Sequence, residues 1–178
     1  NISIIDMRES KKMWMMHMAC YSNISFPMPV YGFDVVCGKS KVTGCFHDFS
    51  PTVDNVSSAT CTRKFKEQTN RFVPKRNREL PQWAKEIFSE NMVIAGATDD
   101  PYEIDSLVHM GKENLFTWLN TVHQAPPCAE SAEVLKYTEA LSKYCTNQLA
   151  NTNSKNVMIA LGLEEDYVTE FKKRQFPY

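Results

Sequence analysis

Two apolar runs near the N-terminus constrain the fold more than any other feature of the sequence. Residues 13–21 (MWMMHMACY) and 30–37 (VYGFDVVC) carry apolar side chains at both odd and even positions. Because neighbouring side chains of a strand point to opposite faces, such runs predict strands that are buried on both faces. Residues 38–41 (GKSK) form a turn signal, and residues 42–49 predict the next strand. These segments predict an antiparallel meander that is covered on both sides.

The remaining segments supply the cover. We expect a further strand over residues 2–7 and another over 91–97, with long helices from Pro101 to His123 and from Glu130 to Leu149. Shorter helices are expected over residues 62–69 and 164–173, and another is expected to begin at Pro81. Residues 151–156 predict a polar break, and a short helix is expected after it. The expected architecture is α+β, an α/β/α sandwich with a central antiparallel sheet flanked by helices on both faces. We expect residues 1–178 to form a single domain, and we expect an N-terminal segment of it to be missing because the sequence begins inside a strand.

Composition excludes several classes of protein. The chain has 178 residues and a net charge of −1, so no overall basic field predicts nucleic-acid binding. No apolar run approaches the ~20 residues that span a bilayer. The six cysteines form no CxxC pair and have no zinc-site spacing with the four histidines, which predicts free thiols, a cytoplasmic location and no metal. Basic residues cluster over residues 63–78. Such a cluster indicates either a solvated loop or a binding site for an acidic partner or an anionic ligand.

Two ionisable residues interrupt the apolar strands. His17 lies among methionines, and Asp34 lies among Phe33, Val35 and Val36. A buried ionised carboxylate without a partner costs several kcal/mol, so Asp34 is expected to be paired, neutral or facing a cavity. Gly32 shares the face of Asp34 and leaves space there for a flat ligand. Each residue alone has a structural explanation, whereas together on neighbouring strands they can act as a coupled proton-donor pair.

Other ionisable residues give weaker evidence for a functional site. His47 and Asp48 are adjacent in a strand and therefore point to opposite faces. His109 and His123 are expected on the surface of a helix. The sequence has no nucleophile elbow, phosphate-binding loop or dinucleotide fingerprint. A redox enzyme built on this chain would need its electrons from outside.

Several motifs in order resemble the ferredoxin-dependent bilin reductases. Residues 29–36 (PVYGFDVV) are similar to that family's P-[IL]-[FY]-G-x-D-[ILV]-V strand, and residues 48–52 (DFSPT) are similar to its D-[LF]-S-P-T strand end. Residues 78–83 (RELPQW) and 87–90 (IFSE) match R-E-L-P-x-W and I-F-S-E, while residues 157–171 resemble the last helices more loosely. The resemblance covers most of the chain.

The resemblance implies roles for individual residues. His17 and Asp34 match the proton-donor pair beside the central pyrroles of a bilin. Arg78 matches a residue that holds a bilin propionate, and Thr43 matches a hydroxyl residue nearby. Lys155 takes the place of a C-terminal lysine with the same task. No cofactor is expected to be bound: a [2Fe–2S] ferredoxin delivers single electrons to biliverdin IXα, and each electron is coupled to a proton. We expect a monomer that binds neither nucleic acid nor membrane, with the basic residues 63–78 as candidates for ferredoxin docking.

Two departures from the family pattern bear on the product. Ile5 stands where the phycocyanobilin-forming members have a glutamate for D-ring vinyl reduction. Asn151 and Asn153 lie in a region where many members that reduce the A-ring diene carry an acid. An amide can bond to the ligand but is not a proton source, so this departure bears on protonation of the A-ring. Without the vinyl-reducing glutamate, the resemblance implies phycoerythrobilin formed through 15,16-dihydrobiliverdin, or this dihydro precursor itself, as in phage-type phycoerythrobilin synthases. A phycocyanobilin-forming reductase, a non-catalytic bilin carrier on the same fold and a reductase of a chlorophyll catabolite are the alternatives.

Overall fold

The computed structural model describes residues 2–77 and 79–176 and contains one five-stranded antiparallel sheet with strand order β1-β2-β3-β4-β5. The strands are the following: β1 (Ile2–Met7), β2 (Met13–Cys20), β3 (Val30–Gly38), β4 (Lys41–Ser50) and β5 (Val93–Ala95). Each strand pairs with the next in the chain, so the sheet is a meander, as the apolar runs and the turn at residues 38–41 predict. The bilin reductase motif strand is β3, at the centre of this sheet.

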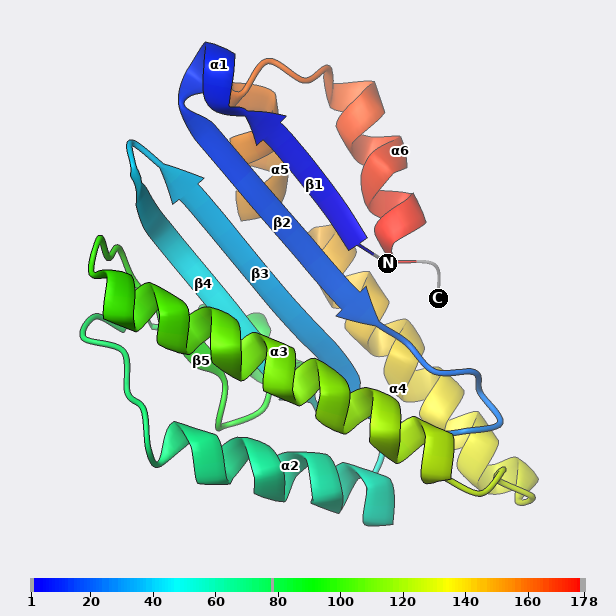
Figure 1. Ribbon diagram of the computed structural model, residues 1–178. Helices are drawn as coiled ribbons and strands as arrows, with labels where there is room; N and C mark the ends of the chain where they lie inside the picture. Colours follow the sequence, from blue (N-terminus) through cyan, green and yellow to red (C-terminus); the bar gives the residue numbers. More distant parts are fainter. Residues whose placement is uncertain (1, 78, 177–178) are drawn as a thin grey trace.

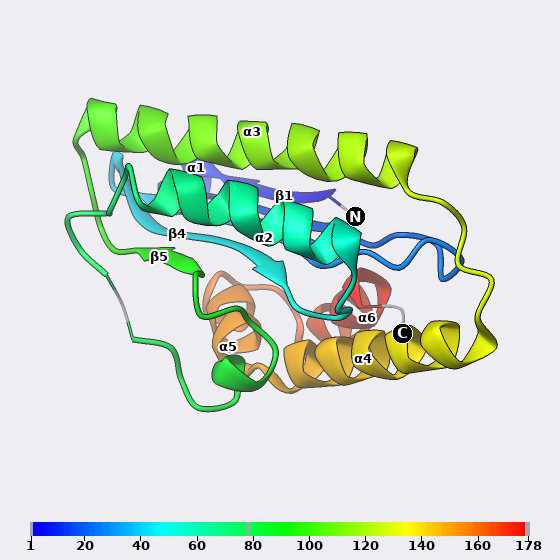
Figure 2. The ribbon, with the colours of Figure 1, turned by 90° about the horizontal axis from the view of Figure 1, so that it is seen from below.

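Helices cover both faces of the sheet (Figure 1). Figure 2 shows α2 (Val56–Thr69) and α3 (Pro101–Gln124) on one face, with α4 (Ser131–Ala150), α5 (Thr152–Ala160) and α6 (Glu165–Gln175) on the other. The expected α/β/α sandwich is confirmed. Two short elements complete the chain: α1 (Arg8–Lys11) in the β1–β2 connection and the 3₁₀ helix η1 (Ala84–Glu86).

Alternation along the strands sorts the side chains into two layers. On the α2/α3 face, Tyr31, Phe33 and Phe49 form a core with Phe65 of α2 and Trp118 of α3. The Tyr31 hydroxyl donates to the Gly111 carbonyl at 2.6 Å, and a Cβ at Gly111 would lie 2.6 Å from the Phe33 ring. Gly111 therefore allows α3 to approach the sheet this closely.

Some boundaries differ from the sequence prediction. Helix α2 begins at Val56 rather than near residue 62, because Asn55 caps it by accepting from the Ser58 N–H at 2.9 Å. The expected helix at Pro81 is only the three-residue η1, and β5 is shorter than residues 91–97. Helix α5 occupies most of the predicted polar break.

Candidate active site

A cavity of about 680 Å³ lies between the sheet and the helices α4, α5 and α6. This volume is within the range of ligand sites, roughly 300–1,000 Å³. The floor comes from β2, β3 and β4, and one wall comes from the segment between α2 and β5. Its apolar and aromatic lining includes the following side chains: Met13, Met15, Val36, Phe46, Leu80, Trp83, Phe88, Phe171 and Phe176. Such walls suit a flat conjugated ligand.

His17 and Asp34 meet on the floor of this cavity. They are direct cross-strand partners in the β2–β3 register, and Nδ1 of His17 lies 2.6 Å from Oδ1 of Asp34. The side chains are 23% and 38% exposed, so the pair is half-buried. The strand pattern predicts this arrangement, since the two residues are on neighbouring strands and share a face.

The partner atoms define what the His17 ring can do. Burial lowers the pKa of His17, but attraction to the Asp34 carboxylate and the hydrogen bond to it outweigh burial, so the pKa lies above its ordinary value. Nε2 of His17 is buried and has no hydrogen-bond partner among the described residues. Phe176 packs edge-on against the ring, with centroids 5.7 Å apart. A protonated His17 can therefore donate from Nε2 while Asp34 holds Nδ1.

Three more predicted residues lie at or near the cavity. Thr43 and Asn151 line it, and the Thr43 hydroxyl donates to the Val36 carbonyl at 3.0 Å. Thr43 is at an irregularity in the β3–β4 register, which lets its side chain reach this side. Gly32 shares the Asp34 face, and a Cβ there would meet nothing within 4 Å. Gly32 thus leaves open space, although it does not itself line the cavity.

Of the other three predicted residues, Lys155 is the one whose side chain the structure describes. Lys155 lies on α5, where its ammonium binds Glu165 at 2.6 Å, and it is not among the cavity-lining residues. Arg78 lies outside the described residues. Asn153 is in α5, and its side chain lies outside what the structure describes.

Lys172 is a lining residue that the sequence analysis missed. Its side chain is only 5% exposed, and Nζ donates to the carbonyls of Leu149 and Asn151 at 2.8 and 2.7 Å. Burial lowers the pKa of Lys172. The two bonds satisfy carbonyls at the C-terminal end of α4 and fix Asn151 in the cavity wall. One sequence feature does indicate that Lys172 is buried. It follows the fully buried Val168 by four residues, so the two side chains lie on the same face of α6.

Two more buried ionisable groups lie in β4, on opposite faces as predicted. His47 is surrounded by Tyr31, Phe33, Phe49 and Phe65, and neither ring nitrogen has a hydrogen-bond partner among the described residues. Burial lowers the pKa of His47 to about 3, so the ring is neutral.

Asp48 belongs to the other face and joins two of the motif segments. It accepts from the hydroxyl of Ser50 at 2.9 Å, and from both the backbone N–H and the hydroxyl of Ser89. Burial raises the pKa of Asp48 to about 6 although these hydrogen bonds favour the charged form. Asp48 does not line the cavity, and its contacts indicate that it holds the segment around Ser89 against the end of β4.

Comparison with known proteins decides the family. The family model described as "Ferredoxin-dependent bilin reductase" matches residues 2–171. The chain belongs to this family. The family predicted from the sequence motifs is therefore confirmed.

Curated relatives agree with this membership. The chain is 27% identical over 156 residues to a phycocyanobilin:ferredoxin oxidoreductase of Trichodesmium erythraeum (strain IMS101), covering 83% of this chain and 59% of the relative. It is 22% identical over 145 residues to the enzyme of that name from Synechococcus sp. (strain CC9605), covering 80% and 57%. The chain thus spans somewhat less than three fifths of the length of each of these relatives.

Solved structures show the same fold. A phytochromobilin synthase from tomato, in complex with biliverdin, has a TM-score of 0.72 at 16% identity, covering 92% of this chain and 61% of that one. A PcyX protein has a TM-score of 0.59 at 25% identity, covering 96% and 68%. Within the part of the chain that the structure describes, no helix combines the length and apolarity needed to cross a membrane.

Several of the bilin reductase motifs line the cavity. Residues 29–36 contribute Asp34 and Val36 through β3, and the RELPQW segment contributes Leu80, Pro81 and Trp83. Among the described lining residues, Asp34 is the only carboxylate. Ile5 is the cross-strand partner of Met15 in β1 and brings no acid to this face.

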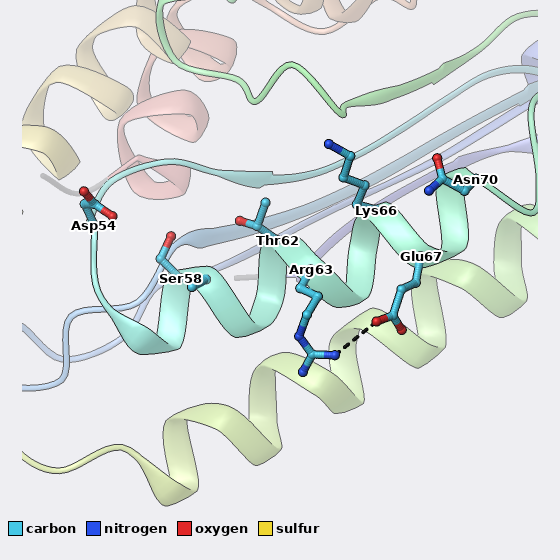
Figure 3. A pocket seen from close by; sticks show the side chains of 8 residues that line it. Asp54, Ser58, Thr62, Arg63, Lys66, Glu67 and Asn70 are labelled. Atoms are coloured by element: carbon cyan, nitrogen blue, oxygen red, sulfur yellow. Dashed lines mark hydrogen bonds and ion pairs between the residues drawn. The ribbon is translucent and has the colours of Figure 1, made fainter.

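A second hollow lies on α2 (Figure 3). Its lining comes from Asp54, from α2 and from Asn70 just after α2, and Arg63 there binds Glu67 at 3.0 Å. Most of these side chains are exposed, and the sheet separates α2 from the cavity beside His17 (Figure 2). The hollow therefore has no part in the candidate active site.

Proposed function

We propose that this chain reduces biliverdin IXα to phycoerythrobilin through 15,16-dihydrobiliverdin, with electrons from reduced ferredoxin. The observation that carries the proposal is the His17–Asp34 pair on the floor of the cavity. Family membership and the shared fold with a biliverdin-bound synthase support the substrate class.

The reduction takes place in single-electron steps. Each ferredoxin supplies one electron, and two electrons with two protons saturate one double bond of the bilin. Two such rounds convert biliverdin to phycoerythrobilin. His17 donates its Nε2 proton toward the bound tetrapyrrole, while the Asp34 carboxylate holds Nδ1 and stabilises the imidazolium. A proton that returns to Nε2 from solvent restores the donor for the next step. The apolar walls hold the bilin flat and exclude water from the radical intermediate.

The distribution of carboxylates supports this product. Reduction of the D-ring vinyl group requires a proton beside that group, and Ile5 offers none. Asn151 supplies hydrogen bonds from the opposite wall without a proton. The His17–Asp34 pair, which contains the only described lining carboxylate, then supplies protons for both reduction rounds, and the vinyl group survives.

Anaerobic turnover with biliverdin and reduced ferredoxin tests the proposal, with products separated by chromatography and identified by visible spectra. We expect a dihydrobiliverdin intermediate followed by phycoerythrobilin. Phycocyanobilin as the main product would contradict the assignment of the product. Tight binding without consumption would indicate a bilin carrier, and preferential binding of a chlorophyll catabolite would indicate a different substrate.

A further inference from the structure

Four lysines gather at one end of the sheet, and we call them the lysine tip: Lys11, Lys12, Lys39 and Lys41. Lys11 and Lys12 lie in the β1–β2 connection, Lys39 lies in the β3–β4 connection, and Lys41 is the first residue of β4. The two connections lie at the same end of the sheet (Figure 1). The backbone N–H of Lys39 donates to the Lys12 carbonyl at 3.1 Å and ties the two connections together. All four side chains are exposed.

The charge of the lysine tip is largely uncompensated. Among the described residues, none of the four lysines forms an ion pair, whereas Lys75 and Lys155 are each paired with a carboxylate. Of the acids near Lys11 and Lys12 in the sequence, Asp6 in β1 binds Arg8 at 2.6 Å, and Glu9 in α1 is the other. The tip therefore presents a local positive surface on a chain whose net charge is −1.

The backbone of the tip favours glycine, yet lysine and serine occupy it. Lys12, Lys39 and Ser40 have φ values of 54°, 52° and 63°, in the left-handed region that glycine adopts with least strain. Lysines at two of these positions keep long basic side chains on a tight turn. This placement indicates a use for the side chains themselves.

The lysine tip borders the cavity. Met13 follows Lys12 and lines the cavity, and Thr43, also a lining residue, lies two positions after Lys41. An ideal Cβ at Gly38 would lie 3.6 Å from the Thr43 side chain and 3.9 Å from the Lys12 carbonyl, so both connections pack at this rim. A protein docked on the tip would sit beside the end of the cavity that β2 and β4 enclose.

The basic residues of α2 offer no such path. Arg63 is paired with Glu67 (Figure 3). Helix α2 lies on the sheet face opposite α4, α5 and α6 (Figure 2), which enclose the cavity. An electron arriving there would have to cross the whole sheet. Electron transfer rates fall steeply with distance, which favours the tip over the α2 face.

We propose that the lysine tip is the docking surface for an acidic [2Fe–2S] ferredoxin. This inference rests on the proposed function and adds to it the place where the electron enters. The donor is oxidised by one electron at each encounter, so two encounters reduce one double bond. Opposite charge on donor and tip raises the rate of association, and salt weakens it.

A pair of charge-matched variants tests the docking surface. The tip variant replaces its four lysines with glutamine (K11Q, K12Q, K39Q, K41Q). The control variant removes four exposed positive charges from the other face of the molecule, with R63Q, K64Q, K66Q and R71Q on and just after α2. Both are assayed with biliverdin at low and high salt, with reduced ferredoxin as donor and with reduced methyl viologen, which needs no protein docking.

We expect the tip variant to raise the KM for ferredoxin by about tenfold or more at low salt and to lose most of its salt dependence. Its turnover with methyl viologen and its affinity for biliverdin are expected to match the wild type, as is the KM of the control variant for ferredoxin. An unchanged KM in the tip variant, or an equal rise in the control, would overturn the proposal. If the wild type reduces biliverdin with neither donor, the proposed function fails. Titration with oxidised ferredoxin then decides the docking surface, since affinity lost only in the tip variant supports it and equal affinities overturn it.

Discussion

Nδ1 of His17 lies 2.6 Å from Oδ1 of Asp34, and the two residues face each other across β2 and β3. Because Asp34 occupies Nδ1, the ring is oriented and Nε2 is left for a ligand. The same contact makes the imidazolium more stable than burial alone would allow. The geometry therefore favours the charged, proton-donating form of His17.

Asp34→Asn is expected to lower the pKa of His17 from above its ordinary value to below it. The substitution removes the attraction and the charge-assisted hydrogen bond, while burial, which lowers the pKa, remains. In the wild type the pair stabilises the fold fully below about pH 6.5, as long as Asp34 is ionised, and this contribution is lost as pH rises through the raised pKa. NMR titration of the His17 ring measures the change, with Asp6→Asn as the control on the opposite sheet face. An unchanged pKa in Asp34→Asn would contradict the pairing.

His47→Phe is expected to stabilise the protein. The substitution removes two buried ring nitrogens that have no partner among the described residues, a gain of roughly 1–3 kcal/mol. The pKa of His47 is about 3 in the folded protein and near 6.5 in the unfolded chain. Between these two pH values the unfolded chain binds a proton at His47 and the folded protein does not. Stability is therefore lost as pH falls from about 6.5 toward 3, and His47→Phe reduces this loss. Urea unfolding at pH 5 and pH 8 measures both effects, and a gain no larger than that of the exposed control His109→Gln would be the opposing result.

Lys172→Met is expected to weaken biliverdin binding by about tenfold, or roughly 1.4 kcal/mol. The variant loses the positive charge of the cavity wall and the two hydrogen bonds that fix Asn151 and the end of α4. Lys155→Met is the matched control, because Lys155 binds Glu165 instead of lining the cavity. Absorbance titration with biliverdin compares the two. Stronger weakening in Lys155→Met would assign the propionate contact to Lys155, as the sequence predicts.

Gly111→Ala is expected to destabilise the fold by roughly 1–3 kcal/mol, because the added methyl group would meet the Phe33 ring at 2.6 Å. This clash exceeds the gain of about 1 kcal/mol that alanine brings to a helix. Gly32→Ala is the contrasting change, since its Cβ would meet no atom within 4 Å. Thermal unfolding of both variants checks the difference. Equal stabilities would show that α3 can shift away from the sheet without penalty.

The strands could be predicted because their side chains alternate between two faces that are both covered. His17 and Asp34 stand out in such runs, since ionisable groups are rare among buried apolar residues. The helices are harder to predict from the sequence. In α2 only Cys61 and Phe65 are buried, so its first turn, which the Asn55 cap begins, has little apolar pattern.

The far wall of the cavity depends on tertiary contacts that the sequence does not display. The first half of α5 consists of polar and small residues, which predict a break over residues 151–156, yet the helix begins at Thr152. Lys172 stands next to Lys173 and Arg174, which predicts solvent exposure. Its burial depends on carbonyls at the end of α4, more than twenty residues earlier in the chain.

The central claim is that the His17–Asp34 pair supplies protons to a bound bilin. Anaerobic single turnover of the biliverdin complex, followed by visible absorbance with ferredoxin or methyl viologen as donor, tests it most directly in wild type and Asp34→Asn. We predict that Asp34→Asn binds biliverdin with near wild-type affinity and reduces it about 10²-fold more slowly or not at all. Reduction by Asp34→Asn at the wild-type rate and to the same product would contradict the account.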